Sequence, residues 1–314
     1  MGVVLGSVAC EGKSSGRSVA PKTTRLVSLA PALTQVICEL GGESMLVGVG
    51  EYDFAAPYDV RVVGHFKDIN TEVLLKVRPT HLLAMYSQRA APSALASYAR
   101  SQSFRLVIYD YPRSVADVSA IIFRQTADRV LTDGADVPSV AEVMKVEETG
   151  RRVHARLHRR LNAIAALTRD RPSASVLMVF DTAPITAIGR ASVLDDLLVR
   201  YVGARNAAAE ASVSAPTFDR EKLLGLKPDV ILLLRPKDPP FASFETDPRV
   251  DVFRDLPIPA VENRRIALIR DPLVLLPGAA LPSIAAAMAK AVYPELGEQI
   301  DAIMAESDTL GEAG

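Results

Sequence analysis

Tryptophan is missing from the 314-residue sequence, and cysteine and histidine are scarce, with two and four copies respectively. A metal site built from side chains needs about three or four ligands, and histidine and cysteine can supply few of them here. The glycine-rich phosphate loops GxGxxG and GxxxxGK and the nucleophile motif GxSxG are also absent. Nucleotide-dependent and serine-hydrolase chemistry therefore have no supporting motif.

An excess of charge of one sign and long apolar runs are equally lacking. The formal net charge is -1, which gives no electrostatic reason to expect nucleic acid or an anionic membrane as partner. The most apolar stretch, residues 272–292, is interrupted by Pro277 and Pro282, and no uninterrupted apolar run is long enough to span a membrane. At 49% apolar and 23% charged residues, the chain is typical of a globular protein with room for two lobes.

The most basic segment is RRVHARLHRR, at residues 151–160. His154 and His158 have the i, i+4 spacing of a helical metal site, but the arginines around them oppose a bound cation. The segment has no aromatic residue for base stacking, and its Val153 and Leu157 belong to an apolar stripe. We therefore expect a solvated helix face here, with neither a metal nor a nucleic-acid partner.

One short pattern occurs twice in the sequence. EVLLKVRPTHLL at residues 72–83 is matched by EKLLGLKPDVIL at residues 221–232, with the glutamate, two leucines, the proline and the last leucine identical in register. Asn70 and Asp219, two residues before each glutamate, are favoured helix N-cap residues. A glutamate in the first turn, two core-facing leucines, a basic residue in the last turn and a proline stop all predict a short helix followed by a strand.

Strands and helices alternate around each copy of this pattern. Around the first copy the predicted strands are 25–31, 45–50, 80–86 and 104–110, and around the second they are 174–180, 229–236 and 264–269. Such alternation is typical of a parallel-sheet α/β lobe, so the sequence predicts two of these lobes.

A helical pattern separates the two lobes. The apolar residues that recur at the spacing of one helix face are Val146, Val153, Leu157, Leu161, Ile164 and Leu167. They predict a helix at about 139–168, roughly 28 residues and about 40 Å long, which is enough to join two lobes. The predicted divisions are a flexible, signal-like tail at 1–22, a first lobe at 23–113, a helical region at 114–171, a second lobe at 172–295 and a polar tail at 296–314.

The two cysteines have different surroundings. Cys38 lies in an apolar helical pattern and is expected to pack as a small core residue, without a disulfide to Cys10. Cys10 follows GVVLGSVA and precedes the polar run EGKSSGRS, which resembles the end of a bacterial lipoprotein signal, where this cysteine is lipidated. Ser7 and the lack of a preceding basic residue depart from that pattern, which leaves an export signal, a start site assigned too far downstream or a cytoplasmic tail as interpretations.

The segments LVSLAPALTQVICELGG, LVGVGEYDFAAP, VVGHFKDINTEVLLKVRPTHLLAMY and FDREKLLGLKPDVILL, in this order, resemble the periplasmic substrate-binding proteins of ABC importers for cobalamin, ferric siderophores and haem. The resemblance covers roughly residues 24–295. It implies two α/β lobes bridged by one long rigid helix, with the ligand in a cleft between them. It also implies an extracytoplasmic, monomeric protein that docks on an ABC permease dimer through one glutamate per lobe, here Glu72 and Glu221.

The resemblance also implies ligand contacts near the carboxyl ends of the strands, where parallel sheets bind ligands. The matching positions in the first lobe are Tyr52, His65, Phe66, Tyr86 and Arg89. Those in the second lobe are Phe180, Asp181, Phe218, Arg235 and Arg270.

A metal chelate is the expected cargo, with no covalently bound cofactor and no resident metal. The absence of tryptophan argues against cobalamin, which relatives commonly clasp with that residue, although Tyr and Phe also offer flat apolar surface. Arg89, Arg235 and Arg270 would suit an anionic ferric siderophore. Tyr86 or His65 would suit the iron of haem.

Two other interpretations remain open. A receptor for free zinc or manganese would need several converging His and carboxylate ligands, and only His65 is suitably placed. An α/β enzyme could use Asp110, Asp181 and His65 as acid and base, but no nucleophile motif supports it. We therefore expect a binding protein and not an enzyme.

Overall fold

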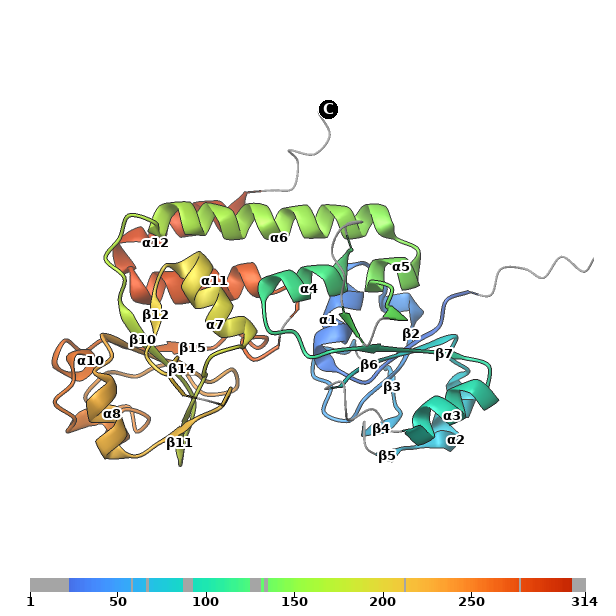
Figure 1. Ribbon diagram of the computed structural model, residues 1–314, viewed down its shortest axis with the longest axis horizontal. Coiled ribbons are helices and arrows are strands. Elements are labelled where there is room, and N and C mark those ends of the chain that lie inside the picture. Colours follow the sequence, from blue (N-terminus) through green and yellow to red (C-terminus); the bar gives the residue numbers. More distant parts are fainter. Residues whose placement is uncertain are drawn as a thin grey trace, which may run out of the picture.

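Two α/β lobes lie side by side beneath one long helix, α6 (Glu147–Thr168), which crosses from the first lobe to the second (Figure 1). The computed structural model describes residues 23–57, 59–65, 68–86, 93–124, 131–132, 135–211, 213–276 and 278–306. The predicted fold class, two α/β lobes joined by a long helix, is confirmed.

The first lobe is built on a parallel sheet in the order β3-β2-β1-β6-β7. Its central strands, β1 (Leu26–Ser28) and β6 (His81–Met85), carry apolar runs that are buried on both faces, as parallel strands between helices are. The other strands are β2 (Leu46–Val49), β3 (Arg61–Val62) and β7 (Arg105–Tyr109). The helices are α1 (Pro31–Glu39), α2 (Thr71–Val77) and α3 (Ser93–Ser101), with a 3-10 turn at Glu43–Met45.

Two short antiparallel pairs lie outside that sheet. One joins β4 (Gly64–His65) to β5 (Asp68–Ile69), and the other joins β8 (Leu131–Thr132) to β9 (Ala135–Asp136). In the first pair Gly64 has a φ of +101°, and an added Cβ would lie 2.6 Å from the Asp68 carbonyl oxygen. This position therefore requires glycine.

The second lobe has a mixed sheet in the order β13-β11-β10-β14-β15, with β12 beside β10. The parallel strands are β10 (Ser175–Thr182), β12 (Arg205–Asn206), β14 (Val230–Leu234) and β15 (Ile266–Ile269). The antiparallel strands are β11 (Ile185–Ala187) and β13 (Thr217–Phe218). Only two residues connect β10 to β11, and so short a connection can join only antiparallel strands. The expected parallel sheet was thus incomplete, because this hairpin extends it.

Helices cover the second sheet and continue to the carboxyl end. They are α7 (Val193–Leu197) with a π-helical turn at Leu198–Val202, α8 (Arg220–Leu226), α9 (Asp251–Arg254), α10 (Pro259–Glu262), α11 (Leu281–Val292), a 3-10 turn at Pro294–Leu296 and α12 (Gly297–Ala305). The predicted polar tail at 296–314 is therefore wrong over 297–305. Ile300 is fully buried there, and Ile303 and Met304 pack beside it against the core.

The predicted single helix at 139–168 is two helices. A capping box at Ser139 starts α5 (Val140–Met144), which ends at Lys145 in the left-handed region with φ 62°. The longer helix, α6, has 22 residues, or about 33 Å. An added Cβ on Gly150 of α6 would lie 2.5 Å from the Ala141 Cβ, so glycine permits the close packing of α5 on α6.

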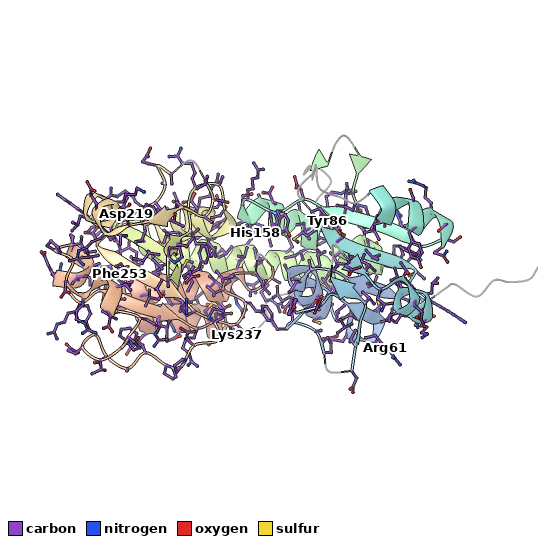
Figure 2. All side chains as sticks on the ribbon, turned by 90° about the horizontal axis from the view of Figure 1, so that it is seen from below. Arg61, Tyr86, His158, Asp219, Lys237 and Phe253 are labelled. Atoms are coloured by element: carbon purple, nitrogen blue, oxygen red, sulfur yellow. The ribbon has the colours of Figure 1, made fainter. Side chains whose placement is uncertain are left out.

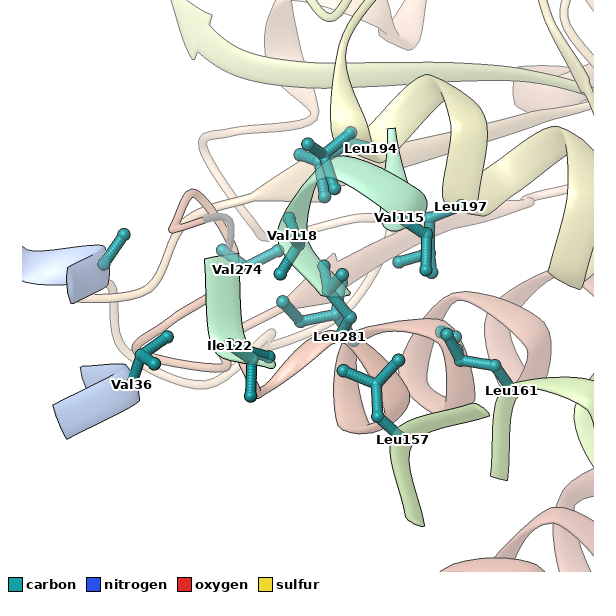
Figure 3. Close-up of a cluster of buried hydrophobic side chains, with 14 of the residues drawn as sticks. Val36, Val115, Val118, Ile122, Leu157, Leu161, Leu194, Leu197, Val274 and Leu281 are labelled. Atoms are coloured by element: carbon teal, nitrogen blue, oxygen red, sulfur yellow. The ribbon is translucent and has the colours of Figure 1, made fainter. Parts of the chain in front are cut away.

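One apolar core extends through both lobes. In Figure 3 Leu157 and Leu161 of α6 lie near Leu281 of α11, and Val115 and Val118 of α4 (Val115–Ile122) lie near Leu194 and Leu197 of α7. The same cluster includes Val36 of α1 in the first lobe and Leu232 of β14 in the second. The lobes are therefore joined by continuous packing as well as by the chain. Among the described helices, none has both the length and the apolar composition of a membrane span.

Candidate functional site

The two copies of the repeated segment form the same structural unit, one in each lobe. The side chains of Asn70 and Asp219 accept a hydrogen bond from the backbone N–H three residues later, at 3.0 and 2.9 Å, and so cap α2 and α8. Arg78 and Lys227 end these helices in the left-handed region, with φ of 46° and 45°. The chain then enters β6 or β14, a strand inside the sheet of its lobe.

Glu72 and Glu221 lie at matching, exposed positions in the first turns of these helices. Glu72 Oε1 accepts from Lys76 Nζ at 2.6 Å, and within the described chain Glu221 has no ion-pair partner. The expectation that both leucines of each copy face the core is wrong for the first copy. Leu74 is buried, but Leu75 is 48% exposed. Together with Glu72 and Lys76, Leu75 lines a pocket on the protein surface.

The loop after β2 presents two exposed aromatic residues. Asp53 anchors this loop, because its Oδ2 accepts from Thr34 Oγ1 at 2.6 Å and its Oδ1 accepts from Ala55 N at 3.1 Å. Burial raises the pKa of the Asp53 carboxyl group, and these hydrogen bonds oppose the increase. Tyr52, with φ 65°, is 78% exposed and Phe54 is 49% exposed. Asp53 therefore anchors a loop whose two aromatic side chains, those of Tyr52 and Phe54, are exposed to solvent.

Tyr86 lies at the carboxyl end of β6, as expected, but it is buried there and not open to a ligand. Its side chain is only 3% exposed and belongs to an apolar cluster of the first lobe. Burial is the main cause that raises the pKa of its phenol, and the neighbouring Tyr111 raises it further. Tyr111, beyond the end of β7, is exposed at this edge. Of the other first-lobe candidates, Phe66 and Arg89 lie outside the described residues, and His65 is described only as backbone in β4.

Four of the five second-lobe candidates, all but Phe218, gather at the carboxyl ends of β10, β14 and β15. Arg235 Nη1 donates to the Phe180 carbonyl oxygen at 3.3 Å, and its Nε donates to Asp238 Oδ2 at 3.0 Å. Asp181 Oδ1 lies 3.8 Å from Arg235 Nη1. Arg270 Nε donates to the Asp238 carbonyl oxygen at 2.8 Å. These candidates therefore lie close together in the structure.

Phe180 and Phe218 have a more structural position than the charged candidates. Both are half-buried, and each packs against one of the apolar clusters, Phe180 beside the core under α6 and Phe218 beside the second cluster of its lobe. Phe218 lies in β13, next to Ile185 of β11. A ligand could reach only the exposed parts of these rings.

A buried ion pair supports the loop that follows β14. Asp247 is 1% exposed, and Arg249 Nε donates to its Oδ1 at 2.7 Å. The Arg249 guanidinium group holds the pKa of the Asp247 carboxyl group well below its usual range. Arg249 Nη1 also lies 3.5 Å from Asp238 Oδ2, which connects this pair to Arg235. The buried ion pair of Asp247 and Arg249 therefore helps to fix the loop formed by residues 235–240.

Contacts outside α6 also link the two lobes. Lys237 Nζ, from the loop after β14, lies 5.4 Å from the centre of the Phe54 ring of the first lobe. Val115 N at the start of α4 donates to Asp196 Oδ2 of α7 at 2.9 Å. Figure 2 shows Lys237 and Tyr86 toward the middle of the molecule, whereas Asp219 and Phe253 lie farther out. A cation over an exposed ring contributes about 0.5 to 1 kcal/mol, so the first contact is easily exchanged.

Lys237, Phe54 and Tyr111 were not among the residues predicted from the sequence. Phe54 follows Tyr52 by two positions in the quoted loop, and Lys237 follows Arg235 by two positions. Their nearness to predicted residues was a usable signal. What the sequence did not reveal is that loops from different lobes meet at Phe54 and Lys237.

Two further pockets lie at the opposite ends of the strands. One, of about 580 Å³, includes Arg25, Thr80 and Phe104, which precede β1, β6 and β7. The other, of about 470 Å³, includes Ala174, Asp229 and Arg265, which precede β10, β14 and β15. Both pockets are therefore at the amino ends of equivalent strands, away from the candidate ligand contacts.

The histidines of α6 are less exposed to solvent than the sequence predicted. Both are half-buried: the His154 ring meets Phe123 edge-on at 6.0 Å, and His158 Nε2 lies 2.8 Å from Ser119 Oγ of α4. In the described part of the chain no group of three or more His, Cys, Asp or Glu residues could hold a metal ion. Cys38 is only partly buried, so it is less of a core residue than expected, and burial raises the pKa of its thiol.

Comparison with known proteins places these features in context. A family model described as periplasmic binding protein matches residues 26–273. The periplasmic heme-binding protein RhuT from Roseiflexus sp. RS-1, in apo form, is 25% identical, with 87% of this chain and 98% of that chain covered and a TM-score of 0.65. No curated protein sequence matches this chain.

Two solved structures from Vibrio cholerae have a similar fold. The periplasmic heme-binding protein HutB is 20% identical, with 87% of this chain and all of that chain covered (100%) and a TM-score of 0.67. The vitamin B12-binding protein BtuF is 17% identical, with 90% and 98% covered and a TM-score of 0.62.

Proposed function

Because this chain belongs to the periplasmic binding protein family, we propose that it is the substrate-binding component of an ABC importer and carries a metal chelate between its lobes. Members of this family work outside the cytoplasm and pass small ligands to a membrane permease. The proposal treats the chelated metal as cargo and assigns no catalytic step to the protein.

The observation that carries the proposal is the contact between Phe54 and Lys237. These residues come from different lobes, and each is on an anchored loop at the carboxyl ends of its strands. Parallel α/β sheets bind ligands at that edge. A ligand placed there would meet aromatic surface from the first lobe and cationic groups from the second.

Haem is the first chelate to test. Its flat ring suits the exposed faces of Tyr52 and Phe54, and its carboxylates suit Lys237 and Arg270. RhuT, the 25% identical structure, is a heme-binding protein by its name. The exposed phenol of Tyr52 is a better iron ligand than the buried phenol of Tyr86. A corrinoid or a ferric siderophore is the alternative cargo.

The competing functions receive less support from the described residues. A free-metal receptor needs converging His and carboxylate ligands, and the described chain offers no group of three. An enzyme would need Asp110 and Asp181 to act together on one substrate. Asp110 Oδ1 accepts from Tyr111 N at 3.1 Å and Asp181 Oδ1 accepts from Ala183 N at 3.2 Å, in different lobes.

Permease docking is assigned to Glu72 and Glu221. Each is exposed and lies in the first turn of the equivalent helix of its lobe, so a two-fold permease dimer could contact both at once. We propose that the protein acts as a monomer with one such contact per lobe.

Membrane attachment through Cys10 is a separate part of the proposal. Cys10 lies outside the described residues, and its support is the lipoprotein-like sequence around it. Labelling with a fatty-acid probe in cells expressing the full-length gene should mark the protein and not its Cys10→Ser variant. An unlabelled wild-type protein would refute lipidation.

The binding role is tested by titrating the purified full chain with haem, cobalamin and a panel of ferric siderophores, with zinc and manganese ions as controls. Absorbance and calorimetry should show one chelate bound per protein and no binding of the bare ions. Tight binding of a bare ion and of no chelate would contradict the proposal.

A further inference from the structure

The carboxylates on the second lobe's strand-end loops are already occupied. Asp181 accepts from Ala183 N at 3.2 Å and lies near Arg235. Asp238 accepts from Arg235 Nε at 3.0 Å. Asp271 accepts from Leu273 N at 2.8 Å and from Ser283 Oγ at 3.0 Å. Each negative charge at this edge therefore has donors within its own lobe.

Two cations at the same edge have uncharged neighbours instead. Lys237 has the Phe54 ring as its neighbour, and Arg270 donates to the main-chain oxygen of Asp238. Neither forms an ion pair with a carboxylate of the described chain. Arg235, in contrast, pairs with Asp238. Lys237 and Arg270 are therefore cations at this edge without an ion-pair partner among the described residues.

The two cations are held near one another by a shared neighbour. Lys237 directly precedes Asp238, and Arg270 Nε lies 2.8 Å from the Asp238 carbonyl oxygen. Asp238 is fixed by Arg235 and by Arg249, which pairs with the buried Asp247. These ion pairs therefore hold the loop in place, while Lys237 lies next to the aromatic Phe54.

We infer that Lys237 and Arg270 form a carboxylate-binding edge and that the cargo is a chelate with at least one carboxylate arm, which this edge selects over a neutral chelate. The inference rests on the proposed function. Without ligand, the Lys237 ammonium group lies over the Phe54 ring. When a chelate binds, its carboxylate arm replaces this ring as the partner of Lys237, and the ring is then exposed for stacking on the chelate. A neutral chelate offers no such exchange, because a charged partner is stronger than an aromatic face.

The test compares haem with haem dimethyl ester, which has the same ring and iron but no free carboxylates. The wild-type full chain should bind haem about three- to tenfold more tightly than the ester. Lys237→Met should weaken haem binding by a similar factor and leave ester binding unchanged, while Lys237→Arg should keep the preference. Lys222→Met, the same change on the exposed surface of α8, is the matched control and should behave as wild type.

Salt supplies a second readout that misfolding would not mimic. Haem affinity of the wild type should fall as ionic strength rises, and this slope should be smaller in Lys237→Met. Equal wild-type affinity for haem and its ester, or an equal loss of both in Lys237→Met, would overturn the inference and leave chelate binding standing. Binding of cobalamin in preference to haem would also overturn it, since cobalamin's peripheral arms are amides. Failure of every chelate to bind would overturn the proposed function as well.

Discussion

Glu72 and Glu221 occupy the same place in opposite lobes, but within the part of the chain that the structure describes only Glu72 has an intramolecular ion pair. Lys76 Nζ lies 2.6 Å from Glu72 Oε1, four residues along α2, and the equivalent position on α8 is Gly225. The first lobe therefore offers a carboxylate that is partly neutralised, whereas the second lobe offers one that has no ion-pair partner among the described residues. If both glutamates pair with permease arginines, the two contacts are unequal.

The first prediction concerns uptake. Replacing both Glu72 and Glu221 by alanine should abolish transport of the cargo into cells or proteoliposomes and leave its affinity for the purified protein unchanged. Glu221→Ala alone should reduce uptake more than Glu72→Ala, because Lys76 already competes for Glu72. An exposed i, i+4 pair is worth about 0.3 to 0.5 kcal/mol, so Lys76→Ala should strengthen docking by roughly twofold.

Glu298→Ala, an exposed change on α12, is the control for this series and should leave uptake unchanged. Undiminished transport by the double variant would refute docking through these glutamates. Equal effects of the two single changes would refute the asymmetry alone.

The second prediction concerns the helix caps of the repeated unit. Asn70→Ala and Asp219→Ala should each lower the free energy of unfolding by about 1 kcal/mol, because each removes the acceptor for a backbone N–H in the first turn. Urea denaturation followed by circular dichroism measures this. Asp219→Asn and Asn70→Asp keep an acceptor and should retain most of the stability; a loss as large as that of alanine would contradict the cap assignment.

These caps illustrate what the sequence was able to predict. Asn70 and Asp219, with the leucines and prolines that follow, specify a local unit, and its helix and strand were found where expected. The stripe from Val153 to Ile164 similarly predicted the buried face of α6. Local spacing determines such elements, so they are readable without tertiary information.

The predictions from the sequence were wrong where contacts between residues far apart in the chain determine the structure. The break at Lys145 depends on α5 packing against Gly150, and α12 exists because Ile300 finds a buried position beside α11 and α6. Tyr86 ends a strand as expected, but the surrounding lobe buries its ring. The meeting of Phe54 and Lys237 could not be predicted, because it depends on how two separately folded lobes are oriented.

The third prediction concerns pH and the buried ion pair below the candidate site. The pKa of Asp247 is lower in the folded protein than its value of about 3.9 in an unfolded chain. Its stabilising contribution is therefore fully present above about pH 4 and is lost as pH falls toward the lower, folded-state pKa. Asp247→Asn should cost about 3 kcal/mol at pH 7, because it leaves the Arg249 charge without its closest partner.

Urea midpoints measured between pH 7 and pH 2 check this. The wild type should lose more stability than Asp247→Asn over the acidic part of the range. Asp251→Asn, which changes a largely exposed carboxylate on α9, is the control and should follow the wild type. Parallel pH profiles for the wild type and Asp247→Asn would contradict the linkage.

The fourth prediction concerns the joint between the lobes. Leu161 of α6 is fully buried in the cluster that includes residues of both lobes, so Leu161→Ala should lower the free energy of unfolding by about 2 to 5 kcal/mol. Calorimetry should show both lobes melting in one transition, at a lower temperature in the variant. Arg152→Ala, an exposed change on the same helix, should have little effect. Two separate transitions, only one of them shifted, would show that the lobes do not share a core.

The central claim is that the cargo binds between the lobes at the carboxyl ends of their strands. A crystal structure of the protein grown with haem tests it most directly. The claim predicts that the porphyrin contacts Tyr52 or Phe54 on one side and Lys237 or Arg270 on the other. Haem bound instead in the pocket beside Thr80 and Phe104, or in the pocket beside Asp229 and Arg265, would contradict it.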